Sequence, residues 1–426
     1  VDYFSLDRDE FVRRYFAGRK EVLEMATTEA AHRRILTDLN NPEQQAIVAA
    51  PLDGNHLVLA GPGSGKTRVI VHRVAWLLRE CMVLPEEVMV LTYNRFAAVE
   101  VKRRLWDLIG PDAAGVSVQT LHGLALRLTG TSYAVAAERG EAIQFDSVIK
   151  AATDMLKRAE QGDDVGPSIQ RDRLLAGLRH LLVDEYQDVN ADHFALISAM
   201  AGRTLNSEED RLSLLVVGDD DQNIYAFGGA NVRFIRQFES DYLAKRFHLV
   251  ENYRSTQHII DCANQVIAGA RDRMKTNQLL RINHARRDQP AGGEFAELDP
   301  VAQGRVHVLE VPGDNFQEVA LALAELERLN LLQFEGSGYW GRFAVIARHW
   351  ERLEPLAALC RQRGIPFRLM RDDHVPDLHT TREGYALLAL LKGDRRHVDR
   401  YRVILKHATL ARWFRRRFKH DVGDLI

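Results

Sequence analysis

Residues 56–67 read HLVLAGPGSGKT and are the part of this sequence from which the fold can be inferred most directly. A short apolar run leads into a glycine-rich segment, and RVIVHRVAWLL at 68–78 follows with the spacing of a helix. A strand, a glycine-rich loop and a helix in that order form a phosphate-binding loop, because backbone N–H groups and the helix amino terminus face the phosphates. These residues therefore predict a nucleotide-binding α/β domain.

The loop sequence predicts a role for each of its residues. Lys66 is expected to contact the β- and γ-phosphates of ATP, and Thr67 is expected to ligate Mg²⁺. The first position of the usual GxxxxGK[ST] pattern is Ala60 here instead of glycine. A glycine-rich turn with a surface lysine is the alternative, which the flanking strand and helix disfavour. The predicted nucleotide-binding residues of the loop are Ala60, Gly61, Pro62, Gly63, Ser64, Gly65, Lys66 and Thr67.

A second apolar run ends in paired acids within LLVDEYQD, residues 181–188. Asp184 is predicted to hold Mg²⁺, and Glu185 is predicted to accept a proton from an attacking water. Taken alone, this segment would be better interpreted as a solvated acidic turn after a buried strand. Together with the phosphate-binding loop it indicates ATP hydrolysis rather than binding alone.

The same α/β pattern extends along most of the chain. Polar residues follow each predicted strand, at the edge where open α/β sheets bind ligands. Residues from about 124 to 175 lack such runs and are predicted to form a helical insertion. A second α/β unit is predicted to begin near Phe247. The predicted strands are 56–60, 88–92, 181–184 and 212–218 in the first unit, and 305–311 and 343–347 in the second.

Length and composition restrict the possible classes of protein. A chain of 426 residues is long enough for two or three domains. The 57 Lys and Arg residues are balanced by 59 Asp and Glu residues, so any nucleic-acid surface must be local. Cys81, Cys262 and Cys360 are too far apart to indicate a disulfide framework or a zinc site. No apolar run reaches the roughly 20 residues that a membrane span needs, so we expect a soluble, cytoplasmic protein without a membrane partner.

Seven segments occur in the order of the motifs of one helicase family. AGPGSGKT and VDEYQD are two of them, and the other five lie before, between and after these. Several motifs in one order are much harder to obtain by chance than any single one. The sequence therefore resembles the UvrD/Rep family of superfamily 1 DNA helicases. The other five segments are NPEQQAIV (41–48), VLTYNRFAAVEVKRRL (90–105), VQTLHGLALRL (118–128), LLVVGDDDQNIYAFGGA (214–230) and VENYRST (250–256).

The resemblance implies roles for residues at the matching positions. Gln44 is implied to read adenine, with Gln45 as the alternative register, and Tyr253 is implied to stack on the base. Gln222 is implied to contact the γ-phosphate, since an amide can bond both a phosphate and the backbone. Arg254 is implied to stabilise charge on the transferring phosphoryl group. A further residue, Gln187, is implied to couple the two halves of the site.

Single-stranded DNA and duplex/single-strand junctions are the implied partners. Aromatic side chains stack on bases of any sequence, which suits a motor that moves along DNA. For a lone aromatic residue, packing in a core or hinge is the alternative, and it stays open for two of these positions, His122 and Tyr225. The implied DNA-binding residues are Tyr93, His122, Tyr225 and Phe227.

The sequence also departs from the family pattern at several places. Phe227-Gly228 stands where relatives often carry Trp-Arg, and Arg95-Phe96 replaces a more usual Asn-Lys pair. Motifs V and VI have no match, although motif VI normally contributes a second phosphate-contacting arginine. Residues 395–419 are strongly basic and could be a DNA-facing helix or a solvated one.

Together these features predict an α/β protein with tandem RecA-like P-loop NTPase domains, parallel sheets and helical insertions. The function that they predict is an ATP- and Mg²⁺-dependent DNA helicase that moves on single-stranded DNA and unwinds duplex in repair or recombination. A non-unwinding translocase and a nucleotide-dependent DNA-binding module of a larger protein, with further domains, are the alternatives. The predicted domains are a helical lead-in at 1–38, a first RecA-like domain at 39–245, a partial second one at 246–380 and the start of a second helical insertion at 381–426.

Overall fold

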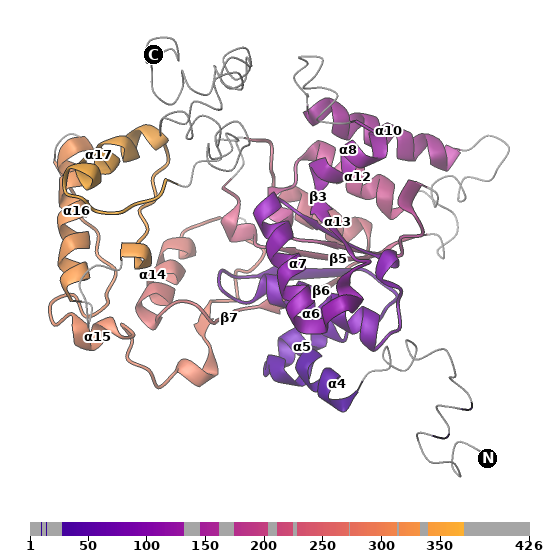
Figure 1. Ribbon diagram of the computed structural model, residues 1–426, viewed down its shortest axis with the longest axis horizontal. Helices are drawn as coiled ribbons and strands as arrows, with labels where there is room; N and C mark the ends of the chain where they lie inside the picture. The colour runs from indigo at the N-terminus through magenta and orange to yellow at the C-terminus, as the bar shows by residue number, and fades with distance from the viewer. Residues whose placement is uncertain are drawn as a thin grey trace, which may run out of the picture. The chain divides into compact units, whose positions relative to one another are not determined.

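Figure 1 shows the computed structural model of the chain. The chain forms two compact units, Val1–Leu309 and Glu310–Ile426. All the candidate site residues discussed below belong to the first unit. The domain boundaries inferred from the sequence stay predictions. The described residues are 28–131, 145–161, 174–202, 211–224, 228–271, 273–312, 315–332 and 340–369, together with Glu10 and Arg14.

A six-stranded parallel sheet organises the first unit, with strand order β3-β2-β4-β5-β1-β6. β1 and β2 are buried at every position, as expected for parallel strands that are covered by helices on both faces. Two predicted strands match the structure residue for residue, and the other two of the first unit differ by one residue at their ends. The strands are β1 (His56–Ala60), β2 (Val88–Thr92), β3 (Ser117–Thr120), β4 (His180–Val183), β5 (Ser213–Gly218) and β6 (Lys245–Leu249).

Helices cover both faces of the sheet and create two hydrophobic cores (Figure 1). β1 contributes to both cores, because Leu57 and Leu59 face one and Val58 and Ala60 face the other. The first core is shared with α8, α10, α12 and α13, and the second with α5, α6 and α7. The helices of this unit are α4 (Glu29–Ile35), α5 (Pro42–Val48), α6 (Lys66–Arg79), α7 (Arg95–Ile109), α8 (Leu121–Thr129), α10 (Phe145–Gln161), α12 (Ala191–Ala201), α13 (Arg233–Asp241), α14 (Gln257–Ala268) and α15 (Phe295–Leu298).

The predicted insertion at about 124–175 is mainly helical over its described residues, which include most of α8 and all of α10. Ile149, Ala152 and Leu156 lie three to four residues apart on α10 and are buried in the first core. The lead-in helix predicted at 1–38 is represented by α4, which begins after the capping side chain of Thr28. Apart from Glu10 and Arg14, the residues before Thr28 lie outside the described part of the chain.

Two strands of the sheet differ from the sequence-based prediction. β6 contains Phe247, which was expected to begin the second α/β unit, but it pairs with β1 and completes the first sheet. β3 has the sequence SVQT and was not predicted, because it is short and half polar. It forms because β2 offers an adjacent parallel strand, in which Val90 faces Val118.

The prediction of strands at 305–311 and 343–347 was wrong, since the structure has no strand in either segment. Val308 is 86% exposed and Ile346 is 91% exposed. A strand needs a neighbour that satisfies its backbone N–H and C=O groups, and neither segment pairs with another strand within the described residues. The only other strands described are β7 (Glu251–Asn252) and β8 (Arg281–Ile282), which form a short parallel pair.

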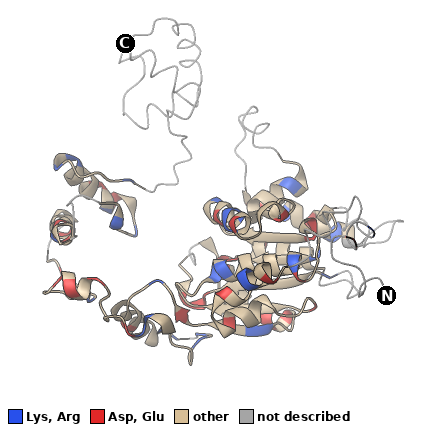
Figure 2. Ribbon diagram, turned by 60° about the horizontal axis from the view of Figure 1, so that its bottom comes forward, with Lys and Arg blue, Asp and Glu red and all other residues tan. Residues whose placement is uncertain are grey.

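The second unit contains α16 (Asn315–Leu331) and α17 (Glu354–Gln362). They pack through a small cluster made of Val319, Leu323, Leu356 and Cys360. Figure 2 shows Lys and Arg mixed with Asp and Glu along the described helices. None of the described helices is both long and apolar enough to cross a membrane. The basic stretch 395–419 lies outside the described residues.

Candidate nucleotide-binding site

The phosphate-binding loop connects the end of β1 to the first residue of α6, Lys66. Gly63 has a φ of 67° and Gly65 a φ of 90°, which side-chain-bearing residues rarely adopt. A Cβ atom at Gly65 would lie 2.8 Å from Nε2 of Gln44, and one at Gly63 would lie 2.8 Å from Nδ2 of Asn252. Both glycines are therefore required by their backbone conformation and by the close approach of neighbouring amides.

A cavity of about 500 Å³ lies beside this loop, which is a suitable size for a small ligand. Most of the residues predicted for nucleotide binding and catalysis line it. Ala60, Gly61, Ser64 and Asp184 are not part of that described lining, and Ser64 instead donates from Oγ to the carbonyl of Gly61 at 2.7 Å. The lining residues are Gln44, Pro62, Gly63, Gly65, Lys66, Thr67, Arg68, Arg104, Glu185, Gln222, Tyr253 and Arg254.

Gln44 lies at the cavity because of the way α5 begins. Asn41 caps this helix, and its Oδ1 accepts from the N–H of Gln44 at 2.8 Å. Gln44 is fully buried and donates from Nε2 to the carbonyl of Ser64 at 2.9 Å, while its Oε1 has no hydrogen-bond partner among the described residues. An unpaired buried acceptor costs about 1–3 kcal/mol, so this oxygen suits a donor on a bound ligand. Gln45 faces elsewhere and donates to the carbonyl of Leu36 at 3.2 Å.

Asn252 attaches the segment that carries Tyr253 and Arg254 to the phosphate-binding loop. Its Nδ2 donates to the carbonyl of Pro62 at 2.7 Å, and its Oδ1 accepts from the N–H of Arg254 at 2.8 Å. The N–H of Tyr253 donates to the carbonyl of Gly63 at 2.9 Å. Asn252 is buried, and its role was not predicted from the sequence, although it directly precedes the two residues that it positions.

Burial, together with the nearby carboxylate of Glu251, raises the pKa of Tyr253 to about 12. The phenol donates to Oε2 of Glu251 at 3.2 Å. Tyr253 is therefore neutral across the physiological range and offers an aromatic ring at the cavity wall. A flat ring at this place can stack on a planar ligand group.

Lys66 and Glu185 meet at the opposite part of the cavity. Nζ of Lys66 lies 3.0 Å from Oε2 of Glu185, and Nε2 of Gln187 donates to the same oxygen at 2.8 Å. Glu185 has a φ of 50°, a left-handed conformation that costs a non-glycine residue about 1–3 kcal/mol. The turn after β4 thus holds this carboxylate in place at an energetic cost, as is common at functional sites.

Asp184 is buried beside this pair, and its Oδ1 accepts from the N–H of Glu185 at 2.9 Å. Burial and the charge of Glu185 raise the pKa of Asp184 to about 7, and the same two causes raise the pKa of Asp188 to about 6. A cation would favour the ionised form of such carboxylates. Asp184 and the hydroxyl of Thr67 are oxygen ligands of the kind that Mg²⁺ prefers, so the residues present fit this ion.

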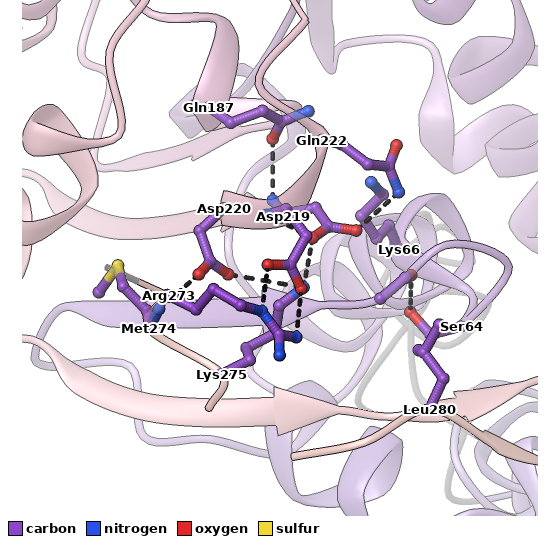
Figure 3. Close-up of polar contacts among 12 residues, drawn as sticks. Ser64, Lys66, Gln187, Asp219, Asp220, Gln222, Arg273, Met274, Lys275 and Leu280 are labelled. Carbon is purple, nitrogen blue, oxygen red and sulfur yellow. Dashed lines mark hydrogen bonds and ion pairs between the residues drawn. The ribbon is translucent and has the colours of Figure 1, made fainter. Parts of the chain in front are cut away.

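Gln187 and Gln222 are joined through Asp219 (Figure 3). The N–H of Asp219 donates to Oε1 of Gln187 at 2.9 Å, and Nε2 of Gln222 donates to Oδ2 of Asp219 at 2.6 Å. Asp219, Asp220 and Asp221 have carboxylate oxygens close enough to hold a metal ion. The ammonium of Lys275 lies among them instead and forms ion pairs with all three.

The residues that the sequence assigned to DNA are only partly described. Tyr93 is half-buried at the end of β2. His122 is half-buried on α8 and packs edge-on against Phe145 and His193, with ring centroids 5.2 and 5.4 Å away. This contact is what the packing alternative for His122 predicts. Tyr225 and Phe227 lie outside the described residues.

Arg68 and Arg104 line the cavity but were not singled out from the sequence. Arg68 follows Thr67 on α6, so its place beside the loop could have been anticipated. Arg104 lies on α7 and pairs with Glu100 at 2.7 Å. Its approach to the cavity depends on how α7 packs against α6, which no local pattern reveals.

Comparison with solved structures gives weak overall similarity. The crystal structure of Pif1 helicase from Candida albicans has 15% sequence identity, covers 68% of this chain and 54% of that chain, and has a TM-score of 0.34.

Comparison of sequences is more informative. DNA helicase II of Haemophilus influenzae is 28% identical over 337 residues, 62% of this chain and 45% of that protein. The ATP-dependent DNA helicase PcrA of Bacillus subtilis is 28% identical over 355 residues, 66% of this chain and 46% of that protein. DNA helicase II of Escherichia coli is 30% identical over 307 residues, 56% of this chain and 42% of that protein.

The chain thus spans less than half the length of these relatives. The UvrD/REP helicase N-terminal domain family matches residues 40–137 and 131–243. These ranges contain the phosphate-binding loop, the acidic turn after β4 and Gln222. Residues 40–243 of this chain therefore belong to the UvrD/REP helicase N-terminal domain family.

Proposed function

We propose that this chain is the ATP-binding motor region of a DNA helicase, which couples ATP hydrolysis to movement along single-stranded DNA and to duplex unwinding. The observation that carries the proposal is the convergence of Gln44, Lys66, Glu185, Gln222 and Arg254 on one cavity. These residues come from five separate segments of the chain. The names of the sequence relatives, which are ATP-dependent DNA helicases and DNA helicase II proteins, support the same reading.

ATP would lie with its base toward Gln44 and Tyr253 and its phosphates along the loop. The unpaired Oε1 of Gln44 accepts from the amino group of adenine, and the Tyr253 ring stacks on the base. Thr67 and Asp184 would hold Mg²⁺, which neutralises phosphate charge when bound. Backbone N–H groups of the loop and the amino terminus of α6 bind the phosphate oxygens.

Lys66 and Glu185 are placed for the hydrolysis step. The ammonium of Lys66 lies 3.0 Å from Glu185, and bound phosphates would offer it a stronger negative charge. Among the described residues Gln187 also donates to Glu185, which would accept a proton from the attacking water. Arg254 would stabilise the charge on the transferring phosphoryl group.

DNA binding is the other half of the proposal. We propose that Tyr93, His122, Tyr225 and Phe227 contact the bases of single-stranded DNA near duplex junctions, in DNA repair or recombination. Aromatic stacking without base-specific hydrogen bonds would let the motor move over any sequence. A cytoplasmic location goes with this proposal.

The test is ATP hydrolysis by this chain with and without single-stranded DNA. We expect hydrolysis that rises with DNA and that Lys66→Ala abolishes, because no other lysine lines the described cavity. Lys150→Ala is the matched control, since Lys150 lies on α10 and pairs with Asp192 at 3.7 Å. Nucleotide binding without hydrolysis would support the nucleotide-dependent binding module instead. A chain that binds no nucleotide would overturn the proposal.

Unwinding and translocation need a second measurement. Strand displacement from a bare forked duplex would support the helicase. DNA-stimulated hydrolysis without strand displacement would support a translocase that moves on DNA without unwinding it. The same Lys66→Ala variant serves as the blank in both assays.

A further inference from the structure

Residues 273–275, which come after α14, hold the three consecutive aspartates that precede Gln222 (Figure 3). Lys275 is 3% exposed, and its ammonium pairs with Asp219, with Asp220 at 3.5 Å and with Asp221 at 3.3 Å. Arg273 forms a two-pronged pair with Asp221 at 2.7 and 2.8 Å. Three neighbouring carboxylates therefore meet two cationic side chains from one short segment.

Burial of these charged groups destabilises the fold unless each has a partner of opposite charge. Carboxylates that are taken out of water and placed beside one another repel, and removing one partner of a buried ion pair leaves an uncompensated charge. Asp219 is fully buried, and Lys275 is the cation that contacts it. Burial raises the pKa of Asp219, and the charge of Lys275 is the strongest influence that opposes this, so Lys275 favours the ionised form of Asp219.

Asp219 links Lys275 to Gln222 at the cavity. Its Oδ1 accepts from Lys275, whereas its Oδ2 accepts from Nε2 of Gln222 at 2.6 Å. The amide nitrogen of glutamine carries two hydrogens. Gln222 donates one of them to Asp219, and this bond fixes the direction of the other N–H because the amide group is planar. Gln222 lines the cavity, and Asp219 therefore fixes the donor that faces it.

The same aspartate is connected to the acidic turn after β4. Its backbone N–H donates to Oε1 of Gln187 at 2.9 Å, and Nε2 of Gln187 donates to Glu185 at 2.8 Å. A continuous chain of hydrogen bonds runs from Lys275 through Asp219 to both Gln222 and Glu185. Displacement of the Asp219 carboxylate would reorient Gln222 directly, and a shift of the Asp219 backbone would also reach Glu185 through Gln187.

We propose that Lys275 is a positioning residue for the γ-phosphate end of the nucleotide site. It acts through Asp219 to orient the amide of Gln222 and does not touch the nucleotide itself. The site would therefore distinguish a nucleoside triphosphate from a diphosphate more strongly when Lys275 is in place. This inference rests on the proposed nucleotide function and goes beyond it by naming the residue that sets this discrimination.

The test compares the affinities of ADP and of a non-hydrolysable ATP analogue with an imido β–γ bridge. We expect wild-type chain to bind the triphosphate analogue more tightly, and Lys275→Met to lose about tenfold of that preference, the effect of one hydrogen bond to a charged group. The affinity for ADP should stay close to that of wild type. Lys150→Met, which removes the exposed pair with Asp192, is the matched control.

Two results would overturn the inference. One is an unchanged preference in Lys275→Met, and the other is an equal loss of affinity for both nucleotides, which is what a purely structural role produces. If wild-type chain bound neither nucleotide, the proposed function itself would fail. A wild-type chain that bound both equally would retain the nucleotide function and refute the discrimination.

A double-mutant cycle tests whether Lys275 acts through Asp219. It also provides a second measurement if Lys275→Met does not fold. Asp219→Asn with Lys275→Met removes one charge of each sign, so the remaining charges are better balanced than in Lys275→Met alone. If Lys275 acts through Asp219, the double variant should show the same triphosphate preference as Asp219→Asn alone. Additive losses would contradict this route. Lys275→Arg keeps the charge and should retain more of the preference than Lys275→Met.

Discussion

Two runs that were both predicted to be strands differ in structure in this protein. HLVLA at 56–60 forms β1, is buried at every position and pairs with β5 on one side and β6 on the other. RVHVLEV at 305–311 forms no strand, and Val308 is 86% exposed. The difference shows that an apolar run becomes a strand only where neighbouring backbone and covering helices exist, because its polar backbone must be paired before its side chains can be buried.

The comparison also explains where the candidate site lies. β1, β4 and β5 are parallel neighbours, so their carboxyl ends lie at one edge of the sheet. The phosphate-binding loop, the Glu185 turn and the segment with Gln222 follow these three ends. The run at 305–311 has no neighbouring strand in the described residues and therefore brings no second set of loops to an edge.

Amide hydrogen exchange should separate the two runs most clearly. We expect the amides of β1 to exchange about 10³-fold or more slowly than those of 305–311, because core strands exchange only through large opening events. Mass spectrometry of peptides that cover each run would measure this. Strong protection at 305–311 would mean that this run is paired in solution and does not differ from β1 in this respect.

The second largest difference is expected when one leucine in each run is replaced by alanine and the free energy of unfolding is measured. Leu59 is fully buried and Leu309 is 59% exposed. Leu59→Ala should lower the free energy of unfolding by about 2–5 kcal/mol, whereas Leu309→Ala should change it by about 0.5 kcal/mol or less. Urea unfolding followed by circular dichroism gives both values. Similar losses at the two positions would show that Leu309 is part of a core.

A histidine in each run gives a pH-dependent comparison. Burial, then the charges of Arg73 and Lys245, lower the pKa of His56 from 6.5 to about 4. Between these pH values the unfolded chain binds a proton that the folded chain excludes, so the free energy of unfolding falls as pH falls through this window, by at most about 3 kcal/mol.

The measurement is urea unfolding at several pH values between 7.5 and 4. His56→Gln should flatten part of the slope, and the same substitution at exposed His307 is the control, which should keep the wild-type slope. If His56→Gln also keeps that slope, burial of this ring does not contribute to the acid sensitivity.

The smallest effect concerns polar contacts in the two compact units. Asn41 is buried, caps α5 and donates to Glu251 at 3.0 Å, so Asn41→Ala should cost about 1–2 kcal/mol. Arg352 pairs with Glu318 at 3.1 Å, but both side chains are more than half exposed. Arg352→Ala should cost about 0.5 kcal/mol or less. Thermal unfolding of both variants measures this, and a larger loss at Arg352 would contradict the expected ranking.

Much of the site could be predicted because its chemistry is local. Lys66 and Thr67 open a helix directly after a glycine-rich loop, and Glu185 directly follows a buried strand, so residue type and spacing identify them. Asn252 and Lys275 could not be recognised in this way. Lys275 is 56 residues from Asp219, and its partners are known only once α14 and the segment after it are placed. That Gln44 rather than Gln45 lies at the cavity likewise depended on which face of α5 meets the loop.

By itself, the sequence determined the four strands at 56–60, 88–92, 181–184 and 212–218 to within one residue, together with the phosphate-binding loop. These features depend on short-range patterns of apolar, glycine and acidic residues. Tertiary structure alone decided that β6 joins the first sheet, that β3 forms despite its polar sequence, and that 305–311 pairs with none of the described strands. The reason is that a strand is completed by hydrogen bonds to a distant part of the chain, and a local pattern does not contain that partner.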